Sequence, residues 1–221
     1  MILSPNFDDR LSETSVDMLV IHYTGMKSSK VALNRLCDPQ AKVSAHYFLD
    51  EDGTRIHLVD EEKRAWHAGD SSWRGLRDVN ERSIGIELVN PGHEYGYRDF
   101  PKAQMTALIE LTIDILSRHS IPARNVVGHS DVAPIRKMDP GERFDWAGLA
   151  VEGIGLWPNE GVEVDHNTDL TALLAEYGYD ISDPVLAITA FQRHFYPENV
   201  NKRPDLETLG RLKSLLELSN A

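Results

Sequence analysis

The chain has 221 residues and a mass of 24.9 kDa, which is enough for one medium domain with a small appendage. Its 23 lysines and arginines against 35 aspartates and glutamates give a net charge of −12. That balance argues against nucleic acid and anionic lipid as partners, because both bind to a broad basic face. A single cysteine, Cys37, excludes an internal disulfide and a multi-cysteine zinc site.

The sequence also predicts where the chain resides. No apolar run reaches the length that crosses a bilayer, so membrane insertion is not expected. The first ten residues lack the basic and apolar regions of a signal peptide. We therefore expect a soluble, cytoplasmic protein; a periplasmic location is the alternative if a native signal precedes this sequence.

Residues 1–158 are predicted to form an α/β domain with a mixed central sheet flanked by helices. Apolar and β-branched runs predict strands, alternating runs joined at Asp52-Gly53 predict a hairpin, and amphipathic spacing predicts helices. The expected strands are 18–24, 44–50, 54–59, 83–90 and 125–129, and the expected helices are 30–36 and 101–119. The polar stretches 61–83 and 130–145 are predicted to be loops at the working edges of the domain.

Residues 159–221 are predicted to form a second, helical unit. Residues 159–168 are acidic and polar, which is typical of a linker. Three amphipathic segments follow at 169–177, 183–195 and 205–218, each starting at an aspartate that can cap a helix. A three-helix bundle of this size hardly supports its own core, so it is expected to lean on the first domain.

Two histidines and one aspartate stand where a metal site would form. His22 lies near the end of an apolar strand, and His129 closes another strand ten residues before Asp139. If the two strands are neighbours, the three side chains converge. Two imidazoles and one carboxylate, with a fourth position left to water, are the ligands of a catalytic zinc site. A satisfied core histidine is the common alternative for His22, and the residues alone leave both interpretations open.

Several segments, in order over about residues 14–150, resemble the zinc-dependent N-acetylmuramoyl-L-alanine amidases of the AmpD/AmiD type. They are Val-Ile-His22-Tyr-Thr, Val-Ser-Ala-His46-Tyr, Ala-Trp66-His-Ala-Gly, Ser-Ile-Gly-Ile-Glu87, and Val-Gly-His129-Ser-Asp continued by Lys137-Met-Asp139-Pro-Gly. The resemblance implies that His22, His129 and Asp139 bind Zn²⁺. It also implies hydrolysis of the amide between N-acetylmuramic acid and L-alanine of the peptidoglycan stem peptide. The lack of an export signal favours the 1,6-anhydro form of that sugar, as in muropeptide recycling.

Glu87 and Lys137 are the predicted catalytic residues. Glu87 is a carboxylate in an otherwise apolar strand, where an unpaired charge is costly. A salt bridge to an arginine within 74–82 is its alternative, and the resemblance favours a role as acid and base. Lys137 lies two residues before Asp139, so its cation can stabilise an oxyanion near the metal. A solvated loop lysine is the alternative.

Five residues are predicted to bind or support the substrate. Trp66 either stacks on a sugar or packs under its loop. His67 is expected to hydrogen-bond the substrate or a metal ligand rather than to close the site as a fourth ligand. His46 is assigned a supporting role, with a core position as alternative. Arg74 and Arg77 are expected to meet the carboxylates of the stem peptide.

The remaining expectations concern other parts of the chain and rival functions. Other histidines, His93 and His194 among them, are assigned to the surface or to packing. The C-terminal unit resembles a peptidoglycan-binding domain of AmiD-type enzymes, and a plain helical cap is its alternative.

The expected function is muropeptide recycling. The rivals are a periplasmic amidase acting on wall fragments, a non-catalytic peptidoglycan-recognition module, and a zinc hydrolase with another amide or ester substrate.

Overall fold

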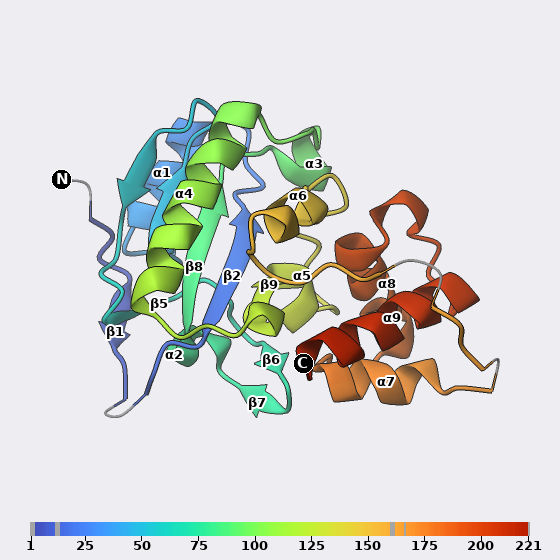
Figure 1. The fold of residues 1–221 in the computed structure, drawn as a ribbon. Coiled ribbons are helices and arrows are strands. Elements are labelled where there is room, and N and C mark those ends of the chain that lie inside the picture. The colour runs from blue at the N-terminus through green and yellow to red at the C-terminus, as the bar shows by residue number, and fades with distance from the viewer. Residues whose placement is uncertain (1–2, 12–13, 160–161, 166, 221) are drawn as a thin grey trace.

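The computed structural model describes residues 3–11, 14–159, 162–165 and 167–220. A five-stranded sheet in the order β4-β3-β8-β2-β9 lies at the centre (Figure 1). Its strands are β2 (Met18–Tyr23), β3 (Tyr47–Leu49), β4 (Arg55–His57), β8 (Ser83–Leu88) and β9 (Val126–Gly128). Strand β2 is parallel to β8 and β9, β3 is parallel to β8, and only β4 is antiparallel to its neighbour. The predicted mixed sheet and its hairpin are confirmed.

One face of the sheet is apolar and covered by two helices. Ile21 of β2 pairs with Ile86 of β8, and paired residues of parallel strands point to the same face. These side chains form a buried cluster with Leu108 and Leu111 of α4 (Lys102–Arg118). Helix α4 crosses this face in Figure 1, and α6 (Trp146–Val151) packs into the same cluster nearer β9. The predicted long helix is confirmed.

The opposite face is covered from two sides. Helix α1 (Ser29–Cys37) packs its buried Ala32 and Leu36 into a cluster with Phe48 of β3. Towards β2 and β9, Val20 and Val127 share one hydrophobic cluster with the C-terminal helices. The predicted boundary after residue 158 therefore does not separate two hydrophobic cores. The C-terminal helices share one core with the sheet, because their apolar side chains pack against it.

The three C-terminal helices begin where their sequence predicts. They are α7 (Leu170–Tyr177), α8 (Pro184–Phe195) and α9 (Leu206–Ser219). Asp169, Asp183 and Asp205 precede them, and each carboxylate accepts hydrogen bonds from backbone N–H groups of the first turn. Of the expected linker, 160, 161 and 166 lie outside the described residues.

The stretch 61–83 is not the irregular loop that its polarity predicts. It contains the short strands β5 (Lys63–Ala65), β6 (Ser72–Trp73) and β7 (Leu76–Arg77), and helix α2 (Val79–Arg82). Strand β5 pairs with β1 (Phe7–Asp9), and β6 pairs with β7. Strands of two or three residues are too short to show alternation, so they are defined by their pairing: β5 with a strand distant in sequence, and β6 with its neighbour β7.

A few short elements complete the chain. They are α3 (Gly92–Tyr95), α5 (His129–Val132) and the 3-10 turns η1 (Ala123–Asn125) and η2 (Pro197–Asn199). Within the described ranges, no helix combines the length and apolar character needed to cross a membrane.

Candidate active site

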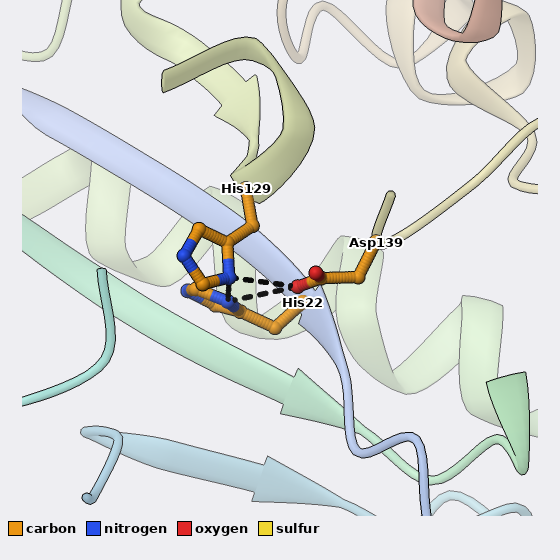
Figure 2. Close-up of side chains that lie close together, drawn as sticks. All are labelled: His22, His129 and Asp139. Atoms are coloured by element: carbon orange, nitrogen blue, oxygen red, sulfur yellow. Dashed lines mark hydrogen bonds and ion pairs between the residues drawn. The ribbon is translucent and has the colours of Figure 1, made fainter. Parts of the chain in front are cut away.

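Three donor atoms meet at the carboxyl ends of the parallel strands. His22 lies near the end of β2, His129 follows β9 directly, and Asp139 lies on the loop after α5. The two Nδ1 atoms are 2.9 Å apart, and Oδ2 of Asp139 lies 3.1 Å from His22 Nδ1 and 3.0 Å from His129 Nδ1 (Figure 2). All three side chains are buried and form a group that can hold a metal ion. The predicted convergence is confirmed.

The contact made by Nε2 of His129 determines that the unprotonated nitrogen, Nδ1, faces the other two donor atoms. Nε2 lies 3.0 Å from the carbonyl oxygen of Ala68. A carbonyl only accepts, so Nε2 carries the proton and Nδ1 keeps its lone pair. A proton shared among three atoms satisfies at most one of their contacts. A cation satisfies all three at once, which is the fit expected for a metal ligand set.

A chain of hydrogen bonds orients His22 in the same way. Ser83 donates its hydroxyl proton to the carbonyl of Val79 at 2.6 Å, so its Oγ accepts from Nε2 of His67 at 3.2 Å. His67 Nδ1 then accepts from Nε2 of His22 at 3.0 Å, which leaves His22 Nδ1 unprotonated. Of the two roles expected for His67, the structure supports the one towards a metal ligand.

This chain needs a glycine at position 85. A Cβ on Gly85 would lie 2.4 Å from Cγ of His67, so Gly85→Ala must displace the ring. We expect the variant to bind Zn²⁺ about 10- to 100-fold more weakly, since such outer partners typically contribute that much to affinity. Competition with a chromophoric chelator measures the effect. Gly153→Ala is the control: its φ of +77° makes alanine costly, but no atom lies within 4 Å of the added Cβ, so zinc affinity should not change. Equal affinity in the Gly85 variant would contradict the role given to His67.

Burial and close contacts shift the pKa values of His22, Asp139 and His67. Burial, and after it the nearby His129 ring, lower the pKa of His22 to about 4, while Asp139 opposes them. Burial alone would raise the pKa of Asp139, but His129 and His22 hold it well below its usual value. Burial also keeps the pKa of His67 well below the ordinary histidine value. Near neutral pH, a neutral His22, a neutral His67 and an ionised Asp139 follow.

Glu87 points into the same region without a partner of its own. It pairs with His22 in the β2–β8 register, so both side chains leave the same face of the sheet. Its Oε2 is buried and lacks a hydrogen-bond partner among the described residues. Burial, then the Asp139 carboxylate, raise its pKa to about 8, and Lys137 opposes them. Arg82, a candidate for the alternative salt bridge, pairs instead with Asp17.

A cleft of about 360 Å³ opens over these groups. Glu87, Lys137 and Trp66 all line it, together with His129 and Asp139. Within the described part of the chain, Nζ of Lys137 has no hydrogen bond or ion pair. The indole Nε1 of Trp66 is buried and has no hydrogen-bond partner among the described residues. The cleft thus combines a metal-type donor set with the unpaired Glu87 carboxylate and the Lys137 ammonium group.

His46 does not line this cleft, and the structure places it in the core. Its side chain is fully buried. Nδ1 accepts from the backbone N–H of Gly85 at 3.0 Å, and Nε2 lies 3.1 Å from the carbonyl oxygen of Lys63, to which it donates. Both ring nitrogens are therefore used to join the sheet to β5, which is the core alternative.

Arg74 and Arg77 do not line this cleft, and their predicted contact with the carboxylates of the stem peptide stays a prediction. They belong to the β6–β7 hairpin, which docks on the C-terminal unit through a bond from Arg74 N–H to the carbonyl of Gly178. Arg77 lines a different cavity of about 250 Å³ together with Asp180. This pairing of short polar strands was not visible in the sequence.

Other residues line the cleft that sequence reasoning missed. Arg35 of α1 and Arg136 supply guanidinium groups there. His93, assigned to the surface or to packing, also lines it; its Nδ1 accepts from the Tyr23 hydroxyl at 2.9 Å, and Nε2 contacts Glu142 at 3.2 Å. Arg136 had a local signal, since it directly precedes Lys137 on the loop of Asp139. Arg35 and His93 reach the cleft through the packing of elements distant in sequence.

Comparison with known proteins agrees with this geometry. A family model described as N-acetylmuramoyl-L-alanine amidase matches residues 12–142. The chain is 40% identical to the N-acetylmuramoyl-L-alanine amidase AmiD of Escherichia coli, covering 91% of this chain and 83% of that protein. It is 34% identical to the 1,6-anhydro-N-acetylmuramyl-L-alanine amidase AmpD of Haemophilus influenzae, over 66% of this chain and 86% of that one.

A solved structure extends the likeness to the whole fold. The complex of Escherichia coli AmiD with anhydro-N-acetylmuramic acid-L-Ala-D-γ-Glu-L-Lys superposes with a TM-score of 0.82 at 35% identity. It covers 96% of this chain and 98% of that structure, so the C-terminal helices are included. This chain belongs to the N-acetylmuramoyl-L-alanine amidase family, because the family model matches residues 12–142 and the similarity to AmiD extends over 91% of the chain.

Proposed function

We propose that this protein hydrolyses the amide between 1,6-anhydro-N-acetylmuramic acid and L-alanine of a peptidoglycan stem peptide, with Zn²⁺ bound by His22, His129 and Asp139. The observation that carries the proposal is the triangle of donor atoms beside the unpaired Glu87 carboxylate. The AmiD complex, whose ligand contains this amide, supports the substrate.

The donor set suits zinc in a catalytic site. Two imidazole nitrogens and one carboxylate oxygen leave a fourth position open, whereas structural sites are closed by four protein ligands. When bound, zinc supplies Lewis acidity to the amide carbonyl and to the attacking water. The protein's part is to hold the two rings in the correct tautomer and to shape the cleft around the amide.

Glu87 is the group that moves the proton. Its Oε2 has no hydrogen-bond partner among the described residues, so no existing bond must break before it accepts a proton from the attacking water and passes it to the leaving amide nitrogen. A carboxyl with a pKa raised to about 8 by burial holds a proton more readily than an ordinary glutamate. A bound zinc ion beside it would lower that pKa again, so the ionised carboxylate could serve as base in the first step and the carboxylic acid as acid in the second.

Lys137 is the group that meets the developing negative charge. Its chain position, two residues before Asp139, keeps the ammonium at the cleft. As the carbonyl carbon becomes tetrahedral, its oxygen gains charge, and a cation already placed nearby stabilises it more than it stabilises the neutral amide. Trp66 and Arg35 line the same cleft and can contact the sugar and the stem peptide.

Incubation of the purified protein with an anhydro-muropeptide tests the function. We expect mass spectrometry to find free stem peptide beginning at L-alanine, its formation to stop with a chelator, and added zinc to restore it. Binding without cleavage would instead favour the non-catalytic recognition module. Cleavage only of another amide or ester would favour the third candidate.

The cellular role stays a prediction. We propose muropeptide recycling in the cytoplasm, for which release from soluble muropeptide but not from intact sacculi is the expected pattern. Release from both would support an enzyme that also acts on wall fragments.

A further inference from the structure

A buried carboxylate, Asp131, closes the turn that carries the metal ligand His129. Asp131 is 1% exposed and is the third residue of α5. Its Oδ2 accepts from the backbone N–H of Gly128 at 2.7 Å, which fixes the chain between β9 and α5. The direction in which His129 leaves the backbone therefore depends on where Asp131 is held.

Two side chains of the C-terminal unit hold it. The hydroxyl of Tyr179 donates to Oδ1 of Asp131 at 2.7 Å, and Nδ1–H of His194 donates to Oδ2 at 2.7 Å. A carboxylate only accepts, so both partners act as donors. His194 also stacks on Trp146, with ring centroids 3.7 Å apart. Tyr179 and His194 are almost completely buried, so water cannot easily replace either bond.

The loop of Asp139 is tied to the same turn. The backbone N–H of Ser130 donates to the carbonyl of Asp139 at 2.8 Å. A Cβ on Gly128 would lie 2.7 Å from Cδ of Pro140 and 3.3 Å from the ring of Trp146, so these side chains pack directly on that glycine. A shift at Gly128 would therefore move the His129 and Asp139 ligands together.

We propose that Tyr179 and His194 are positioning residues for the metal site, so that the C-terminal helices set metal affinity by holding Asp131. The inference rests on the proposed zinc site and gives these helices a task other than glycan binding. If either donor is lost, the buried carboxylate of Asp131 loses one of these hydrogen bonds and is held less firmly against the Gly128 amide. The positions of His22, His129 and Asp139 relative to one another then become less fixed, although none of these three residues has been substituted.

Single substitutions in the full chain test this. Tyr179→Phe and His194→Phe remove the donors and keep the rings, and His194→Asn retains an N–H that can reach Asp131. Tyr177→Phe is the matched control, because Tyr177 is as deeply buried but does not hydrogen-bond to Asp131. We expect the Kd for Zn²⁺, from chelator competition, to rise about 10-fold or more in the two donor-free variants. It should rise less in His194→Asn and stay unchanged in Tyr177→Phe.

A second measurement needs no metal. Hydrogen exchange of the Gly128 amide in the zinc-free protein should accelerate in Tyr179→Phe and not in Tyr177→Phe. If Tyr179→Phe lowers the Tm but leaves both zinc affinity and this exchange rate as in the wild type, the contact is packing alone and the proposal is wrong. If the wild type itself binds no zinc, the proposed metal site fails, which is a separate outcome.

Discussion

Glu87→Gln should lower kcat by about 10²- to 10⁴-fold, the usual contribution of a positioned acid or base. The amide has nearly the shape of the carboxylate but cannot take a proton from water. Zinc affinity should stay close to that of the wild type, because Glu87 is not one of the three donor residues. Steady-state kinetics on an anhydro-muropeptide, together with a zinc titration, measure both effects.

The control for this variant is Glu110→Gln, the same substitution on α4, across the sheet from the cleft. It should leave kcat unchanged. Turnover near the wild-type rate in Glu87→Gln, with zinc bound, would remove Glu87 from its role and leave the proton transfer to another group. Joint loss of zinc and activity would instead make Glu87 a support of the metal site.

Lys137→Met should lower kcat by about 10²- to 10³-fold, comparable to the loss of one oxyanion donor in other hydrolases. Methionine has an unbranched side chain like that of lysine, but it carries no positive charge. A pH profile gives a second signature. The Lys137 cation lowers the pKa of Glu87, so its removal should raise that pKa. If ionised Glu87 is the base, the limb on which activity rises with pH should move to higher pH.

Lys102→Met, at the exposed start of α4, is the control for the loss of one lysine charge. It should change neither kcat nor the pH profile. An unchanged kcat in Lys137→Met would mean that the lysine is a solvated loop residue, as its alternative interpretation has it.

The sequence predicted those features whose signals are local. The capping aspartates at 169, 183 and 205 located three helix starts, because a side-chain acceptor is needed where backbone N–H groups are free. The alternation of Ile84, Ile86 and Leu88 placed Glu87 on the opposite face of its strand, where the structure has it. The convergence of His22 with His129 followed from two neighbouring parallel strands.

Features that depend on distant packing were not predictable in this way. Arg35 lines the cleft because α1 packs over β3. Arg74 does not line it, and its backbone N–H donates to the carbonyl oxygen of Gly178 in the C-terminal unit. His46 carries the same residue type and stands in a matching motif, yet both of its nitrogens bind backbone groups. His194 lies more than sixty residues after Asp131, so only the docked helices show that they meet.

Diffraction at the zinc absorption edge, from crystals of the zinc-loaded full chain, tests the central claim most directly. The account predicts one strong anomalous peak bounded by Nδ1 of His22, Nδ1 of His129 and Oδ2 of Asp139, with Glu87 beside it but not coordinating. An active, zinc-loaded protein with no peak at that point, or with its peak at another group of side chains, would contradict it.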